Sequence, residues 1–317
     1  MRTQKELSKD VIHYAAKLLR KLNKTFQNVI ERKDSEGVHD FRKITRDLQS
    51  LISACDVKQH VPKTKKIRRD LQSWRHALSA WRDADVMVES VKQARQKAHH
   101  TYEQDIWPAV VERTTKQRNR ALKKFLKSAD FQKMDKLRKN IRGFVKSRAK
   151  AEPMADNLSY LLEQGWQKLD FAIGEFERAA IAANLHAVRI KVKTLRYALN
   201  LRQRFYPDKR LEDSSVWLKG LQDRIGGWHD ELTLSELVRA TLSESNTIVD
   251  PKRAEVVEGI KEKEITMAES ARNYLLSMRE KQEYKRLRRV LSAAIYATAK
   301  SDDAKAAAQQ SAIGLMQ

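Results

Sequence analysis

The 317-residue sequence contains little of what interrupts helices, forms disulfides or spans membranes. It has 9 glycines, 5 prolines and one cysteine, Cys55, and only 7% of its residues are aromatic. A single cysteine cannot form an internal disulfide, and no apolar run approaches the roughly 18 residues that a membrane span requires. The N-terminal residues Met1 to Glu6 do not begin a signal peptide. We therefore expect a cytoplasmic protein without a membrane segment.

Signatures of common catalytic and cofactor sites are also missing. The 8 histidines form no His-Glu-x-x-His pattern, and the chain has neither a Gly-x-x-x-x-Gly-Lys-(Ser/Thr) loop nor a Gly-x-Gly-x-x-Gly motif. Hydrolysis of a phosphoanhydride needs a positioned metal or a general base, and no recognisable set of residues supplies either. We interpret His99 and His100 as a solvated pair. We expect no metal site, no cofactor and no enzymatic activity.

Positive charge, in contrast, is abundant. Lys and Arg number 64 against 41 Asp and Glu, which gives a formal net charge of +23. The excess lies in residues 1–150, which hold 38 cations and 17 acids, whereas residues 151–317 hold 26 and 24. Within the first half, residues 113–150 carry 15 cations and two acids. Such a surplus is typical of proteins that bind polyanions.

The stretches between the few Gly and Pro residues favour helices. They are rich in Ala, Leu, Lys, Arg, Glu and Gln, and they show no alternating strand pattern. A hydrophobic content of 41% is sufficient for a folded core. We therefore predict an all-α fold with about eight helices, four in each half. The expected breaks lie near residues 34–37, 57–62, 107–108, 152–153, 183–184, 206–208 and 243–251.

A motif recurs at an interval of 147 residues. His39, Arg42 and Arg46 are followed at this interval by His186, Arg189 and Lys193. Five further positions agree at the same interval, namely Leu71/Leu218, Trp81/Trp228, Asp83/Asp230, Glu89/Glu236 and Val91/Val238. A duplicated unit of this kind predicts two similar basic surfaces that face one partner. We assign residues 1–150 to the first repeat, residues 151–298 to the second, and residues 299–317 to a loosely ordered tail.

Each motif predicts an amphipathic helix with one cationic side. At about 100° per residue, His39, Arg42, Arg46 and Gln49 share an arc of about 80°, and apolar residues such as Phe41 and Leu48 lie opposite. The second copy places His186, Arg189, Lys193 and Arg196 on the equivalent arc. A solvated basic face is the alternative for any single helix. A solvated face does not require histidine at the head of the arc in both copies, so we interpret the arcs as ligand-facing.

The helix after each motif carries further cations. The first half has Arg68, Arg69, Arg75 and Arg82, and the second has Lys219, Gln222 and His229 at positions matched to Gln72, Arg75 and Arg82. We expect Asp83 and Asp230 to orient a neighbouring arginine or histidine by a charge-assisted hydrogen bond. Trp81 and Trp228 are interpreted as packing residues.

The motif His-x-x-Arg-x-x-x-(Arg/Lys)-x-Leu, paired with Leu-Lys-x-Leu-Gln-x-x-Ile-Gly-x-x-His-Asp over residues 218–230, resembles the CHAD family, the conserved-histidine α-helical domain. The resemblance covers residues 4–297 approximately. It implies two four-helix bundles related by a pseudo-twofold axis, with inorganic polyphosphate bound in a basic central channel. Two positions depart from the family pattern, because Asp47 and Gln49 stand where members commonly carry cations; we expect the first copy to rely on Lys43 and the following helix.

The sequence therefore predicts non-catalytic binding of inorganic polyphosphate, with polyphosphate granules as the implied location. Non-specific binding of nucleic acid, through residues 113–150 above all, is the alternative. The motif arcs lack the interleaved aromatic residues that stack on bases. Nothing in the sequence predicts an oligomeric state. The predicted contacts, from the resemblance and the two arcs together, are His39, Arg42, Lys43, Arg46, Arg68, Arg69, Arg75, Arg82, His186, Arg189, Lys193, Arg196, Lys219 and His229.

Overall fold

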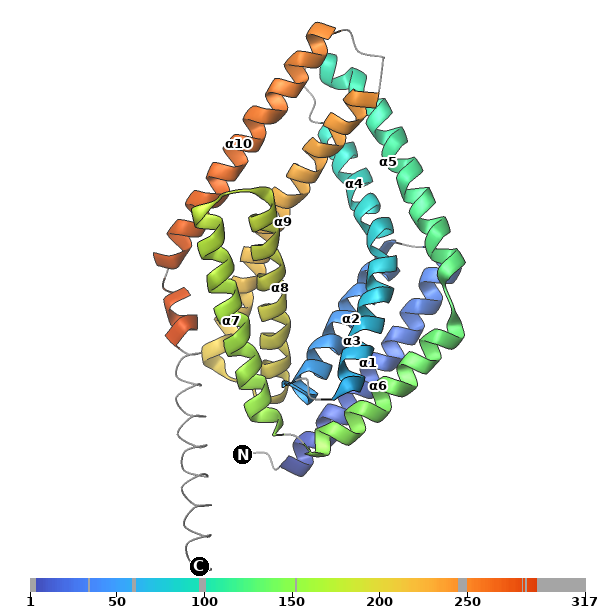
Figure 1. Cartoon of the computed structure of the whole chain (residues 1–317), viewed down its shortest axis with the longest axis vertical. Coiled ribbons are helices and arrows are strands. Elements are labelled where there is room, and N and C mark those ends of the chain that lie inside the picture. Colours follow the sequence, from blue (N-terminus) through green and yellow to red (C-terminus); the bar gives the residue numbers. More distant parts are fainter. Residues whose placement is uncertain are drawn as a thin grey trace, which may run out of the picture.

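The computed structural model describes residues 4–33, 35–58, 61–96, 101–151, 153–244, 250–280, 282 and 284–289, and all the elements in these ranges are α-helices (Figure 1). The predicted all-α fold is therefore confirmed. The predicted tail over residues 299–317 lies outside the described residues, as do His99 and His100. The helices are α1 (Gln4–Arg32), α2 (Ser35–Cys55), α3 (Pro62–Ala77), α4 (Ser79–Gln96), α5 (Thr101–Ser128), α6 (Phe131–Ala151), α7 (Met154–Arg178), α8 (Ala182–Phe205), α9 (Lys209–Glu244) and α10 (Asp250–Glu280).

The described residues form ten helices where about eight were expected, and helix boundaries differ from the expectation at three places. Leu78 separates α3 from α4, and residues 129–130 separate α5 from α6, where the Asp130 carboxylate accepts the Lys133 N–H at 3.0 Å as a helix cap. Neither break is marked by glycine or proline. The break expected at residues 107–108 is wrong, because α5 continues through Pro108. Trp107 and Val110 flank this proline and pack against residues of α4 and α9, which holds the helix together there.

Helix boundaries in the two halves recur at the interval of the sequence motif. Helices α2 and α8 begin at Ser35 and Ala182, and α3 and α9 begin at Pro62 and Lys209, in each case 147 residues apart. One difference between the halves is that residues 62–96 form two helices where residues 209–244 form one. A division into two bundles after residue 150 stays a prediction.

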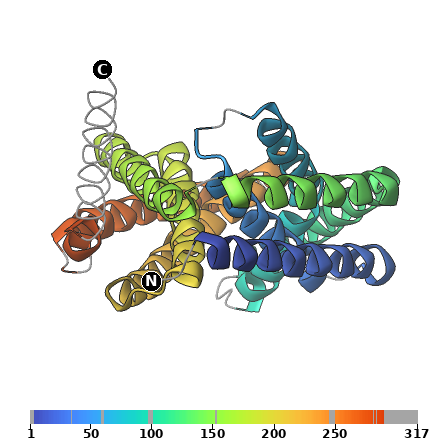
Figure 2. The ribbon, with the colours of Figure 1, turned by 90° about the horizontal axis from the view of Figure 1, so that it is seen from below.

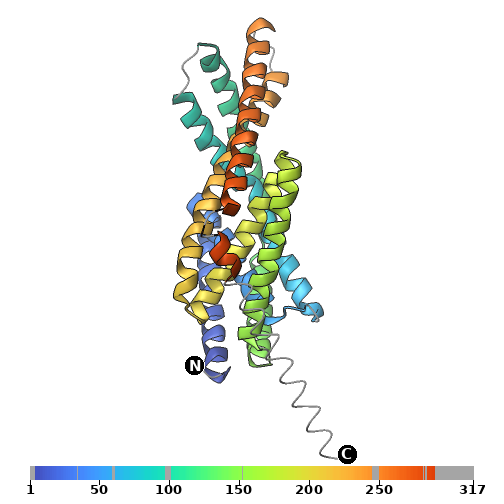
Figure 3. The same cartoon turned by 90° about the vertical axis from the view of Figure 1, so that its left-hand side faces the viewer.

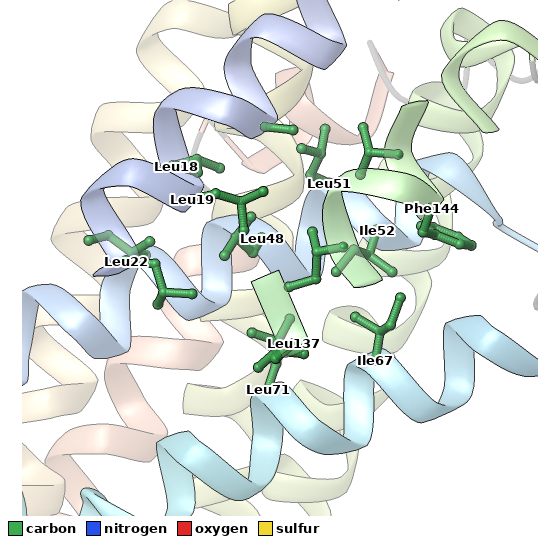
Figure 4. Close-up of a cluster of buried hydrophobic side chains, with 14 of the residues drawn as sticks. Leu18, Leu19, Leu22, Leu48, Leu51, Ile52, Ile67, Leu71, Leu137 and Phe144 are labelled. Carbon is green, nitrogen blue, oxygen red and sulfur yellow. The ribbon is translucent and has the colours of Figure 1, made fainter. Parts of the chain in front are cut away.

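Apolar side chains from the first half form the larger core. Leu22 of α1, Leu48 of α2, Leu71 of α3 and Leu137 of α6 lie within it, all of them at most 3% exposed (Figure 4). Burial of leucine side chains contributes roughly 1.5–3 kcal/mol each to folding. Helices α7 to α10 build a second core around Leu169, Val188, Leu195, Leu221 and Leu275.

The halves touch at two separate places. At one end, Phe205 of α8 joins the first core and meets Tyr14 of α1 edge-on, with ring centroids 5.8 Å apart. At the other end, the hairpins α4–α5 and α9–α10 meet in a small apolar cluster of Met87, Val91, Val110, Val238 and Leu242 (Figure 1). Between these contacts, α2 and α4 face α8 and α9, and Figure 2 shows the two halves side by side from below.

One glycine permits a close helix approach beside the motif. A Cβ atom added to Gly165 of α7 would lie 3.2 Å from Cδ1 of Leu195 and 3.6 Å from its Cα, on the motif helix α8. Glycine at this position therefore sets how closely α8 lies against α7. Figure 3 shows the hairpins α4–α5 and α9–α10 extending away from the other helices along the long axis. Among the described residues, no helix combines the length and apolarity that crossing a membrane demands.

Candidate functional site

Two arginines at equivalent positions of the repeat form the centre of the site. Arg42 of α2 has its Nη2 atom 4.0 Å from Oδ1 of Asp83 on α4, and Arg189 of α8 has its Nη2 atom 3.8 Å from Oδ1 of Asp230 on α9. The arginine side chains are only 15% and 22% exposed. The distances are those of ion pairs and exceed hydrogen-bond length. Asp83 and Asp230 thus face arginines as expected, but as ion-pair partners.

Serine hydroxyls hold two of the first-half arginines without neutralising them. Arg42 Nη1 donates to Ser79 Oγ at 2.6 Å, and Arg82 Nη1 donates to Ser35 Oγ at 2.8 Å. A neutral acceptor fixes the orientation of a guanidinium and leaves its full charge available. These contacts fix the direction in which the first-half cations point.

The two positions that depart from the family pattern also contact cations. Gln49 Oε1 accepts a hydrogen bond from Arg75 Nη1 at 2.8 Å, which joins α2 to α3. Burial raises the pKa of Asp47, and Lys43 and Arg196 oppose that shift by their charge. Asp47 therefore lies between a cation of its own helix and one of α8 across the two halves.

The second half presents imidazole and ammonium groups where the first presents guanidinium. The rings of His186 and His229 lie with their centroids 5.0 Å apart. His229 stands at the position of Arg82, and Lys193 stands at that of Arg46. The charge of the second half therefore depends on pH more strongly than that of the first.

Several buried polar atoms near the site lack partners. Within the described part of the chain, the Nε atoms of Arg189 and Arg196 and the Oε1 atom of Gln222 have no hydrogen-bond partner. Buried donors of this kind are uncommon in folded proteins. Two arginine donors on α8 are therefore unsatisfied within the chain.

The cations of the two halves are close enough to perturb one another. Burial is the main cause that lowers the pKa of Arg42; Arg46, Arg82 and Arg189 lower it further, and Asp83 opposes them. Burial likewise lowers the pKa of Arg75 to about 10, with Arg46 and Arg42 adding to the effect. The charged cluster therefore reaches from the first half to Arg189 in the second.

Burial and neighbouring cations also lower the pKa values of a lysine and a histidine in the second half. Burial, followed by the charges of Arg189, Arg46 and Arg42, lowers the pKa of Lys193 to about 7. Burial, with the charge of Arg189 next, lowers the pKa of His229 to about 4. Without a ligand, the site holds some of its cations at an electrostatic cost.

The histidines at the head of each arc follow the same pattern. Burial lowers the pKa of His39, and Arg82 is the next cause; burial lowers the pKa of His186, and Arg189 is the next cause. Burial also raises the pKa of Asp230, which Arg189 and Lys193 oppose. All these groups therefore occupy a partly desolvated region in which the cations outnumber the acids.

The structure brings most of the predicted contacts together. Contacts or electrostatic effects connect His39, Arg42, Lys43, Arg46, Arg75, Arg82, His186, Arg189, Lys193, Arg196 and His229, either directly or through Asp47. Arg68 and Arg69 lie earlier on α3 than Arg75 and have no such connection among the described residues. Lys219 pairs with Asp223 on its own helix at 4.0 Å. Their roles stay predictions.

Ser35 and Ser79 were not anticipated from the sequence. They lie 47 and 37 residues from the arginines that they bind, so no local pattern connects them. Ser79 lies one helical turn after Arg75, and its Oγ donates to the Arg75 carbonyl at 3.0 Å. This spacing of four residues is a weak indication, from the sequence, that Ser79 lies near the cations of α3. Within the described ranges, His, Cys, Asp and Glu form no group of three that could hold a metal ion.

Comparison with known families and structures identifies the family of this chain. The CHAD domain family model matches residues 13–239. The chain belongs to the CHAD domain family. The resemblance seen in the duplicated motif is thereby confirmed. All the helices that carry the site lie in the matched region of this CHAD domain, apart from the end of α9, whereas α10 lies beyond it.

Two solved structures share the CHAD fold of this chain. The CHAD domain from the plant Ricinus communis is 20% identical with a TM-score of 0.58, and the match covers 92% of each chain. PptA from Streptomyces chartreusis is 15% identical with a TM-score of 0.60, and the match covers 89% of this chain and 100% of that one. Comparison with curated protein sequences gives no match. At these identities, the two structures support the fold alone.

Proposed function

We propose that this CHAD domain binds inorganic polyphosphate between its two halves and does not hydrolyse it. The family is associated with polyphosphate binding, and the domain is of a non-catalytic, binding type. The observation that carries the proposal is the convergence of cations from both halves, with Arg42 and Arg189 at equivalent positions.

The chemistry of the cluster fits a chain of phosphates. A guanidinium offers several N–H donors in a planar fork that matches phosphate oxygens, so Arg42, Arg75, Arg82 and Arg189 can each bind two oxygens at once. A polyanion would also relieve the repulsion that lowers the pKa of Lys193 to about 7. The site therefore gains both hydrogen bonds and charge compensation from one ligand.

The ligand would run through a basic channel between α2 and α4 on one side and α8 and α9 on the other. A flexible polyphosphate can contact both halves along its length, and its displaced counterions add to the affinity. This path accounts for the duplicated motif, since each half supplies an equivalent share of the contacts. A location at polyphosphate granules follows from such binding.

A competition assay tests the proposal. Fluorescent long-chain polyphosphate is bound to the full chain at physiological salt, and unlabelled polyphosphate or duplex DNA is added at equal phosphate concentration. We expect polyphosphate to displace the probe at least tenfold more effectively than DNA, because only a flexible chain enters between the halves. Equal displacement by DNA would contradict a polyphosphate-specific site.

A further inference from the structure

A second concentration of positive charge lies away from the central site, on α5 and α6. Nine cations in these helices are exposed, and none forms an ion pair with a described residue: Arg120, Lys123, Lys124, Lys127, Lys136, Lys139, Arg142, Lys146 and Lys150. We call these nine residues the α5–α6 basic face. Neighbouring cations differ, because Lys116 pairs with Glu112 and Arg138 with Asp135. The acids near this face are thus already engaged.

The cations of the α6 part of the face form a row along one side of the helix. Its cations, from Lys136 to Lys150, are spaced three, three, four and four residues apart. At about 100° per residue they fall within an arc of about 120°, and the row extends for about 21 Å. The opposite side of α6 carries Leu137, Ile141 and Phe144, which are buried in the first core. Packing therefore holds the row rigidly toward solvent.

This face is separate from the proposed polyphosphate site. Helix α6 packs against α1, α2 and α3, and Figure 1 shows α5 and α6 along the outer edge of the first half. None of the nine cations is among the causes that shift the pKa values of Arg42, Lys193 or His229. The nine cations are therefore not close neighbours of these three groups.

The face also departs from the internal repeat. Seven of its nine positions have no cation 147 residues later; Lys124 corresponds to Ala271 and Lys127 to Tyr274, for example. Only Lys139 and Arg142 have cationic counterparts, Arg286 and Arg289. A surface that served the shared central ligand would be expected in both halves. The basic face is present in one half only, which points to a partner of its own.

We propose that the α5–α6 basic face binds a nucleic acid duplex through its phosphate backbone, without reading its sequence. The face is mostly lysine, which binds phosphate as a point charge and not through a directional fork. A row of about 21 Å spans about six base pairs of a duplex at 3.4 Å per base pair. A rigid duplex contacts such a row without the ordering cost that a flexible chain would incur.

Other polyanionic partners fit the face less well. Single strands are bound through several aromatic side chains on which bases stack. Beside the row, the described residues include one exposed aromatic side chain, Phe131, which is 51% exposed and packs edge-on against Phe26 with ring centroids 5.2 Å apart. A membrane-binding helix presents apolar anchors next to its cations. Leu122 and Leu126, the apolar neighbours on α5, pack instead against the first core.

The test compares two quadruple variants of the full chain with equal loss of charge. The first removes the row by Lys136→Gln, Lys139→Gln, Arg142→Gln and Lys146→Gln. The matched control removes four exposed second-half cations by Lys168→Gln, Lys209→Gln, Lys263→Gln and Arg272→Gln. The probe is a fluorescent 20-base-pair DNA duplex of arbitrary sequence, titrated at several salt concentrations, with circular dichroism to confirm folding. A duplex RNA of equal length and vesicles with 30% phosphatidylserine are parallel probes.

We expect the row variant to lose at least tenfold in duplex affinity and its log–log salt slope to decrease by about 3, whereas the control changes by less than threefold. DNA and RNA duplexes should respond alike. Equal losses in the two variants, or row-dependent binding of vesicles in place of duplex, would overturn the proposal. A third variant, Arg42→Ala/Arg189→Ala, should keep duplex binding and lose polyphosphate. If this variant still binds polyphosphate as the wild type does, the result would contradict the central polyphosphate site, and the proposal for the basic face would be unaffected.

Discussion

Arg189 and Asp230 lie 3.8 Å apart, and this contact is repeated by Arg42 and Asp83 at 4.0 Å, each residue shifted by 147 positions. A contact that recurs between equivalent residues of both halves indicates a common local geometry around each arginine. The acids balance only part of the surrounding charge, because Arg46, Arg82 and Lys193 lie nearby as well. This surplus is the physical basis of the proposed affinity for polyphosphate.

Binding should take up protons near neutral pH. In the free protein, burial and neighbouring cations lower the pKa values of His39 and His186, so both are mainly neutral at pH 7. Bound phosphate favours the charged form and raises these pKa values. Since the protonated site then binds more tightly, affinity should increase as pH falls from about 7.5 to 6.

Calorimetric titration in two buffers of different ionisation enthalpy measures this uptake directly. The structural alternative is that both histidines stay neutral and only support the helix packing. Absence of proton uptake, together with unchanged affinity in a folded His39→Gln/His186→Gln variant, would remove both histidines from the site.

The charged form of Lys193 should lower the stability of the free protein and strengthen the binding of polyphosphate. Its pKa of about 7 in the folded chain lies below the usual 10.5, so the unfolded chain binds more protons between these values and stability rises with pH across that window. Below pH 7, Lys193 is charged in both the folded and the unfolded chain, and its destabilising effect on the folded chain is largest. Lys193→Met should therefore raise the free energy of unfolding by about 1 kcal/mol at pH 6, and less at pH 9.

Thermal denaturation at both pH values, with and without polyphosphate, measures the effect. We expect a melting temperature about 2–4 °C higher for the free variant at pH 6 and a weaker stabilisation by the ligand. Lys191→Met on the same helix is the control, since Lys191 shows no link to the cluster. A variant that is less stable at pH 6 than the wild type would contradict the charge penalty at Lys193.

Polyphosphate should remain intact on the protein. Within the described residues no group of three side chains could hold a metal ion, and the CHAD domain is of a non-catalytic, binding type. Cations alone position a phosphoanhydride without providing the attacking group. Incubation with long-chain polyphosphate and Mg²⁺ or Mn²⁺ should release no orthophosphate above background. Metal-dependent release that His39→Ala abolishes would show that the domain is an enzyme.

The motif helices could be predicted because their signal is local. Periodicity alone places Arg42 and Arg46 on one side of the helix and Phe41 and Leu48 on the other. The structure buries Phe41 and Leu48 completely. The break at Leu78 could not be predicted, since leucine favours helix and the turn there depends on tertiary packing. The same holds for the low pKa of Lys193, because its causes include Arg46 and Arg42 from the other half of the chain.

The central claim is that equivalent arginines from both halves hold one ligand, and a binding titration of the Arg42→Ala/Arg189→Ala variant tests it most directly. Each charge-assisted hydrogen bond to phosphate contributes about 1.5–3 kcal/mol, so the double variant should lose at least a hundredfold in affinity for polyphosphate at physiological salt. The control is Lys123→Ala/Lys124→Ala, which removes the same charge from the outer surface and should cost less than threefold. Equal losses in the two variants would show that diffuse positive charge, and not the site between the halves, holds the ligand.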